Sequence, residues 1–91
     1  MDKQLTAFLA VARNGTTTAA AKHLNVAQSA VTKRIVNLEH ELGTALFLRE
    51  YRGMSLTEAG EMFLARARLI EREYRDGKDE ISAIASAGLS N

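Results

Sequence analysis

The chain has 91 residues, a net charge of +1 and no cysteine. This length suits one small domain, or one domain plus an appendage, with a modest core. The absence of cysteine excludes a disulfide framework and a thiolate metal site. No apolar stretch approaches the length of a membrane span or a signal peptide, so we expect a soluble, cytoplasmic protein with no membrane partner.

The first predicted element is a helix with apolar residues at helical spacings of three and four, namely Leu5, Phe8, Leu9 and Ala12. Gly15 follows, and glycine suits the left-handed conformation in which many helices end. The threonines at 16–18 then supply hydroxyl groups that can cap the next helix.

Two apolar stripes then meet at a turn, and we predict a helix-turn-helix over about residues 17–36. The first stripe is Ala20, Ala21 and Leu24, and the second is Val31, Ile35, Leu38 and Leu42. Asn25 tolerates the left-handed backbone that a sharp turn requires, and Val26 can fill the gap between the helices. The far side of the second helix stays free, and such a helix fits the DNA major groove.

The helical phase predicts which residues face DNA. With the apolar stripe inward, a step of about 100° per residue turns Ser29 and Lys33 outward and leaves Thr32 at the flank. Docked helices of this class contact bases mainly with their N-terminal turns. We therefore predict a DNA-binding set of Gln28, Ser29, Thr32 and Lys33. The alternative, a polar face that contacts only water, accounts less well for the tight turn and the small residues at the crossing.

Residues 46–56 predict a short β-hairpin, because two apolar runs flank a turn that contains glycine. After a helix-turn-helix such a hairpin is a wing, and Arg49 and Arg52 are placed to reach the phosphate backbone or a minor groove. We expect Phe47 and Leu48 to pack under the helices. The alternative is a solvated loop with incidental charges.

Thr57 is a plausible cap for a helix from 58 to about 87, roughly 45 Å long. An apolar seam with heptad spacing follows it: Phe63, Ala67, Ile70, Tyr74, Gly77, Ile81 and Ile84. Because little of the domain is left to cover this seam, we predict a homodimer in which it pairs with the same helix of a second subunit. The part near Phe63 can instead cover the domain core.

The charge is unevenly distributed along the chain. Residues 1–57 contain seven Lys and Arg against four Asp and Glu, a net charge of +3, whereas residues 58–91 contain five against seven, a net charge of −2. The basic excess therefore lies with the helix-turn-helix, which favours nucleic acid as the partner. The excess is mild, and this favours a dimer that doubles the phosphate contacts.

Many of these residues also match one family in order. The matching positions are Leu5, Phe8, Val11, Ala12, Gly15, Thr16, Ala19, Ala20, Ala21, Leu24, Val26, Gln28, Ser29, Ala30, Val31, Thr32, Ile35, Leu38, Glu39, Leu42, Gly43, Leu46, Phe47, Arg49, Arg52, Leu56, Thr57, Ala59 and Gly60. In this combination the chain resembles the N-terminal DNA-binding region of LysR-type transcriptional regulators. The resemblance is dense over residues 1 to about 65 and looser along the long helix.

The resemblance implies a mainly α fold, with a winged helix-turn-helix in residues 1–57 and a linker helix in residues 58–91 that pairs two subunits. It implies a bacterial regulator that binds interrupted inverted repeats at promoters as a dimer. Such regulators respond to small molecules through a C-terminal effector domain, which we expect to be absent from this chain. We therefore expect no cofactor in this region.

Carried over by position, the resemblance implies base and backbone contacts for the recognition-helix set, and backbone or wing contacts for Thr16, Thr18, Arg34, Arg49 and Arg52. The chain departs from the usual family pattern at some of these positions and at positions beside them. Family members commonly have an aromatic residue in place of Thr17, Pro in place of Ser29, Ser in place of Thr32 and Arg in place of Lys33. Ala27 stands where a capping hydroxyl is frequent.

Nothing in the sequence predicts an enzyme. His23 and His40 lie on different predicted helices without a third ligand at metal-binding spacing, and no serine has the sequence context of a nucleophile. The remaining alternative to DNA binding is a protein–protein interaction module whose helix-turn-helix is only a scaffold. The basic excess on the recognition helix and wing favours DNA binding.

Overall fold

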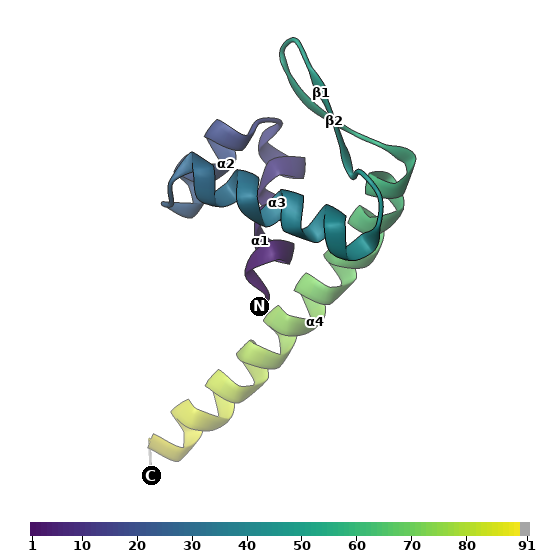
Figure 1. Cartoon of the computed structure of the whole chain (residues 1–91). Coiled ribbons are helices and arrows are strands. Elements are labelled where there is room, and N and C mark those ends of the chain that lie inside the picture. The colour runs from purple at the N-terminus through teal and green to yellow at the C-terminus, as the bar shows by residue number, and fades with distance from the viewer. Residues whose placement is uncertain (90–91) are drawn as a thin grey trace.

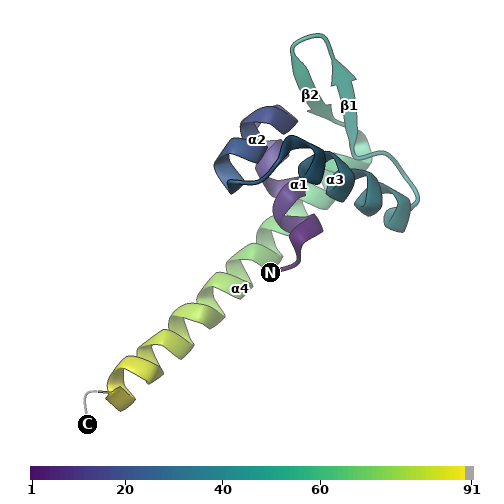
Figure 2. The ribbon, with the colours of Figure 1, turned by 60° about the vertical axis from the view of Figure 1, so that its left-hand side comes forward.

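The computed structural model describes residues 1–89, which form four helices and one hairpin (Figure 1). Their order is α1 (Lys3–Asn14), α2 (Thr17–Leu24), α3 (Gln28–Leu42), β1 (Phe47–Glu50), β2 (Gly53–Leu56) and α4 (Glu58–Leu89). The first three helices and the hairpin form a compact head, and α4 begins in the head and extends far beyond it (Figure 2). The predicted winged helix-turn-helix with a long following helix is confirmed; residues 90 and 91 of the predicted linker segment lie outside the described residues.

Side-chain caps set where three of the helices begin. The Asp2 carboxylate accepts the N–H groups of Gln4 and Leu5, in the first turn of α1, at 2.7 and 3.0 Å. The Thr16 hydroxyl accepts the N–H of Ala19 at 3.0 Å, and the Thr57 hydroxyl accepts the N–H of Gly60 at the same distance. These bonds satisfy N–H groups that have no partner within the helix. The predicted capping roles of Thr16 and Thr57 are confirmed.

Left-handed residues set where the first three helices end. Gly15, Asn25 and Gly43 follow α1, α2 and α3 with φ of 81°, 58° and 75°. Asn25 is the one residue other than glycine with positive φ among residues 1–89. The Val26 N–H then donates to the Ala21 carbonyl at 3.0 Å, which closes the turn between α2 and α3. The predicted roles of Gly15 and Asn25 are confirmed.

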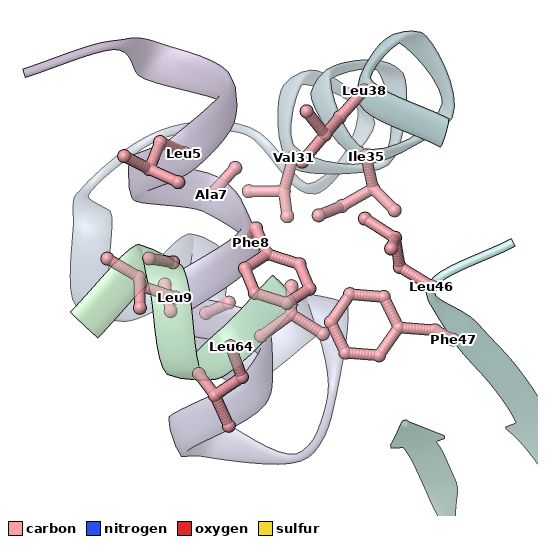
Figure 3. Close-up of a cluster of buried hydrophobic side chains, with 14 of the residues drawn as sticks. Leu5, Ala7, Phe8, Leu9, Val31, Ile35, Leu38, Leu46, Phe47 and Leu64 are labelled. Atoms are coloured by element: carbon pink, nitrogen blue, oxygen red, sulfur yellow. The ribbon is translucent and has the colours of Figure 1, made fainter. Parts of the chain in front are cut away.

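The core of the head surrounds Phe8, which is fully buried (Figure 3). The centroid of the Phe8 ring lies 5.3 Å from that of the Phe47 ring and 5.1 Å from that of the Phe63 ring, which it meets edge to face. Side chains from α1, α3, the start of the hairpin and α4 complete this core, including Leu9, Val31, Ile35, Leu38, Leu46 and Leu64. The N-terminal part of α4 is therefore an integral part of the head.

The structure corrects three expectations about burial. Leu42 is 43% exposed because it is the last residue of α3 and lies beyond the part of the helix that covers the core. Leu48 is 54% exposed because successive side chains of a strand point to opposite faces, and Phe47 takes the inner one. Ala67 is completely buried in the core of its own chain, so its assignment to a dimer interface is wrong.

Beyond the core, α4 has almost no contact with the rest of the chain. Arg13 of α1 forms an ion pair with Glu71, and every residue from 72 to 88 is exposed. The molecule accordingly measures 56 × 25 × 20 Å along its principal axes. Within residues 1–89, no helix combines the length and apolar character needed to cross a bilayer.

Candidate nucleic-acid interface

The wing is held against the turn between α1 and α2. The two strands pair antiparallel, with Phe47 opposite Leu56 and Glu50 opposite Gly53. The N–H of Met54 donates to the Gly15 carbonyl oxygen at 2.9 Å. A Cβ atom on Gly53 would lie 2.7 Å from this same oxygen, so the close approach requires glycine here. This contact brings the hairpin beside the start of α2.

The base of the wing is fastened to α3 and α4. One carboxylate oxygen of Glu39 in α3 accepts the N–H groups of Leu46 and Phe47 at 2.7 and 3.3 Å. The Thr57 hydroxyl donates to the Ala45 carbonyl at 2.7 Å, so the chain is held on both sides of the hairpin. Glu39 therefore positions the wing, which accounts for a negative charge within residues 1–57, the part of the chain with a net positive charge.

A groove opens between the N-terminal ends of α2 and α3 and the wing; we call it the α2–α3–wing groove. Its lining residues are Thr16, Thr17, Gln28, Thr32, Arg49, Glu50, Gly53 and Met54. It thus brings together four residues that the sequence predicts as DNA contacts, Thr16, Gln28, Thr32 and Arg49. The N-terminal ends of two helices also favour anions, since their free N–H groups carry partial positive charge.

The other predicted contacts surround this groove without lining it. Ser29 and Lys33 are exposed on α3, and Thr18 is exposed on α2. Arg34 is half-buried, and Arg52 is exposed in the two-residue turn between the strands. All five lie on the same elements as the groove residues, and their roles in binding DNA stay predictions.

Three residues of this region were not predicted from the sequence as DNA contacts. Glu50 places a carboxylate in the groove and accepts a hydrogen bond from the Ser55 hydroxyl at 2.6 Å. Tyr51 is 98% exposed beside Arg52, and an aromatic residue in a predicted turn was the available signal. Thr17 lines the groove and accepts a hydrogen bond from the Gln28 side-chain nitrogen at 3.1 Å. Nothing in the sequence indicates this last contact, because the two residues meet only in the folded chain.

The predicted dimer seam is exposed only along the free part of α4. Ile70, Tyr74, Ile81 and Ile84 are between 47 and 69% exposed, and Gly77 is exposed among them. Phe63 is half-buried against the core of the head. The exposed part of the predicted seam therefore begins where α4 leaves the head and continues along the free part of the helix.

Comparison with known proteins identifies the family. Residues 3–61 match the model of the bacterial regulatory helix-turn-helix protein, lysR family. The chain is 42% identical over 82 residues to the HTH-type transcriptional regulator YybE of Bacillus subtilis, covering 90% of this chain and 28% of that protein. It is 47% identical over 66 residues to the HTH-type transcriptional regulator ClcR of Pseudomonas putida, covering 72% of this chain and 22% of ClcR.

Solved structures agree with this assignment. The DNA-binding domain of CbnR, crystallised with DNA, superposes with a TM-score of 0.83 at 42% identity, covering 93% of this chain and 99% of that one. The DNA-binding domain of BenM, crystallised with catB site 1 DNA, superposes with a TM-score of 0.87 at 32% identity, covering 94% and 98%.

The two curated relatives are named as transcriptional regulators, in agreement with the expectation that the chain is not an enzyme. The chain spans about a quarter of their length. The helix-turn-helix, the wing and the long α4 are the elements that it shares with the DNA-bound structures. The chain belongs to the LysR family of bacterial regulatory helix-turn-helix proteins and carries the DNA-binding domain of that family.

Proposed function

We propose that the chain recognises an interrupted inverted repeat in promoter DNA as a homodimer. The observation that carries this proposal is the α2–α3–wing groove, in which Thr16, Gln28, Thr32 and Arg49 meet although they come from three separate elements. Hydroxyl, amide and guanidinium groups are the side chains that bind phosphates and base edges.

In this proposal the N-terminal turns of α3 enter the major groove. Gln28, Ser29 and Lys33 face outward there, and all three are exposed. Gln can pair with adenine, and Lys can donate to guanine. Thr16, Thr18 and Arg34 would contact phosphates, and they would fix the register of α3 on the duplex.

The wing would follow the DNA backbone into the neighbouring minor groove. Arg49 lines the groove beside α3, whereas Tyr51 and Arg52 are exposed in the turn between the two strands. Arginine suits both sites, because its guanidinium matches phosphate and is attracted to a narrow minor groove.

The exposed seam of α4 would join two subunits. Ile70, Tyr74, Ile81 and Ile84 expose apolar surface along the part of α4 that extends beyond the core of the head. Pairing with a second copy would bury this surface and would relate two recognition helices by a two-fold axis. An inverted repeat in DNA mirrors that symmetry.

Further proposals concern the whole protein. A function on promoter DNA places the chain in the cytoplasm of a bacterial cell. A small-molecule effector would act through a C-terminal domain, as the family resemblance implies, so residues 1–89 would need no cofactor to bind DNA. LysG of Corynebacterium glutamicum is a full-length relative by structure that was solved with the effector Arg.

Selection of bound sequences from a random duplex library at near-physiological salt tests the proposal. The expected result is enrichment of an inverted repeat whose two arms share one sequence. Enrichment of a single half-site would contradict the homodimer. No enrichment, with binding lost at modest salt, would contradict sequence-specific recognition and favour a partner-binding module.

A further inference from the structure

A hydrogen bond between two side chains connects the first residues of the two helices of the helix-turn-helix. The side-chain nitrogen of Gln28, the first residue of α3, donates to the hydroxyl oxygen of Thr17, the first residue of α2, at 3.1 Å. Both residues line the α2–α3–wing groove. The contact therefore lies at the part of α3 that is proposed to enter the major groove.

The beginning of α3 has no other side-chain support of this kind. Its N-cap residue is Ala27, which makes no side-chain hydrogen bond, whereas α1 and α2 are capped by Asp2 and Thr16. Gln28 is exposed and has a long side chain with several rotatable bonds, so ordering it on DNA costs conformational entropy. The bond to Thr17 holds the amide group before DNA arrives and reduces this cost.

The chemistry of the hydroxyl group decides which way the Gln28 amide faces. A phosphate oxygen only accepts hydrogen bonds, so a threonine hydroxyl that contacts DNA backbone must donate its proton to the phosphate. The Thr17 oxygen can then only accept, and its donor is the Gln28 nitrogen. The amide keeps its oxygen and one N–H free for DNA.

This pair of free groups matches one base. Adenine offers an N6–H donor and an N7 acceptor in the major groove, which complement the amide oxygen and the remaining N–H. Guanine offers two acceptors, O6 and N7, and the amide oxygen would then face another acceptor. An amide held in this orientation therefore favours an A·T pair.

We propose that Thr17 is a positioning residue that orients the Gln28 amide and thereby sets a preference for adenine at one position of each half-site. The inference rests on the proposed function, because it requires the N-terminal turn of α3 to lie in the major groove. The proposal includes a contact of the Thr17 hydroxyl with a backbone phosphate, beside those proposed for Thr16 and Thr18, and Thr17 acts on the base only through Gln28.

Two variants at position 17 separate positioning from a backbone contact. Thr17→Val keeps the shape of the side chain and removes the hydroxyl, whereas Thr17→Ser keeps the hydroxyl. Each variant and the wild-type chain would be tested by library selection and by affinity for four duplexes that differ only at the selected adenine. Circular dichroism and thermal unfolding would establish that each variant is folded.

The expected result is that the wild-type chain and Thr17→Ser prefer adenine at this position by about tenfold, whereas Thr17→Val prefers it by less than threefold. In a Gln28→Ala background, Thr17→Val should change the preference no further. If Thr17→Val weakens all four duplexes equally and keeps the preference, Thr17 is only a backbone contact and the inference is overturned.

The same inference is overturned if the wild-type chain selects a sequence that shows no adenine preference dependent on Gln28. A wild-type chain that selects no sequence at all would instead contradict the proposed function. The two failures are thus distinguishable in one experiment.

Discussion

Arg13 near the end of α1 and Glu71 in the middle of α4 form a bidentate ion pair, although they lie 58 positions apart in the sequence. One guanidinium nitrogen of Arg13 donates to a Glu71 carboxylate oxygen at 3.0 Å, and the other contacts the second oxygen. Arg75, one turn further along α4, lies 3.4 Å from the same carboxylate. Beyond this pair, every residue of α4 from 72 to 88 is exposed.

This ion pair predicts a pH-dependent contribution to stability. The hydrogen bonds from Arg13 lower the pKa of the Glu71 carboxyl below its ordinary value of 4.5. A lowered pKa in the folded state stabilises the fold above pH 4.5, and the contribution is lost as the pH falls through the lower folded value. Because Arg13 is half exposed, the contribution should be small, about 0.5 kcal/mol.

Urea unfolding of the wild type and Glu71→Gln at about pH 7 and pH 3 measures this contribution. The wild-type chain should be more stable at neutral pH, and the difference should shrink in acid. Glu73→Gln, an exposed carboxylate on the same helix, is the matched control and should show no such difference. A Glu71→Gln difference that is equal at both pH values would refute the assignment.

Lys33→Ala tests direct recognition by α3. Lys33 is exposed on the outer face of this helix, and the loss of a direct base contact should cost about 1–3 kcal/mol and relax discrimination at one base pair. Fluorescence anisotropy with the selected duplex and its single-base variants gives both quantities. Lys3→Ala, at the start of α1, is the control and should change neither the affinity nor the discrimination. If Lys33→Ala leaves the discrimination between bases unchanged, Lys33 is not a direct base contact.

Glu50→Gln should strengthen binding to DNA. The Glu50 carboxylate lies in the α2–α3–wing groove, where it would repel a phosphate, and an amide oxygen can still accept the Ser55 hydrogen bond. Removal of one charge in a solvated groove should raise the affinity roughly twofold to fivefold, with a larger effect at low salt. Glu41→Gln, at the far end of α3, is the control. Equal effects of the two substitutions at every salt concentration would indicate only a change in net charge.

Substitution by alanine should destabilise the fold at Gly60 but not at Gly77. A Cβ atom on Gly60 would lie 2.1 Å from the Leu46 carbonyl oxygen, so Gly60→Ala must displace the base of the wing. The substitution should lower the free energy of unfolding by about 1–3 kcal/mol. Nothing lies within 4 Å of a Cβ atom on Gly77, and Gly77→Ala should leave stability unchanged or raise it by up to about 1 kcal/mol. Denaturant unfolding of both variants is the measurement, and equal stabilities would contradict the close packing at Gly60.

Ile81→Glu should convert a homodimer into monomers. Ile81 is 66% exposed on the free part of α4, and a buried carboxylate without a partner would strongly oppose pairing of this face. Sedimentation equilibrium at micromolar concentration measures the association. Ser82→Glu places the same charge on the neighbouring position and should leave the dimer intact. A wild-type chain that sediments as a monomer would contradict pairing through α4.

Local chemistry made most of the fold predictable from the sequence. Gly15 and Asn25 end helices because few other residues adopt positive φ, and the period of the apolar stripes identifies α3 and α4. Periodicity does not tell where a core ends, and the errors at Leu42 and Ala67 have this cause. Leu42 lies just beyond the core, whereas Ala67 still lies within it.

Part of the candidate site was predictable as well, because local sequence pattern places single residues but not the contacts between distant ones. Gln28 and Arg49 could be assigned from helical phase and from the position of the wing. The contacts of Gln28 with Thr17 and of Arg13 with Glu71 join residues 11 and 58 positions apart, so only the folded chain places them together.

Titration of the ¹⁵N-labelled chain with its selected duplex tests the central claim most directly. If the α2–α3–wing groove binds DNA, amide chemical shifts should change most around Thr16, Thr17, Gln28, Thr32 and Arg49, and residues 78–88 of α4 should change little once the dimer has formed. Changes concentrated along α4, with the groove residues unaffected, would contradict the account.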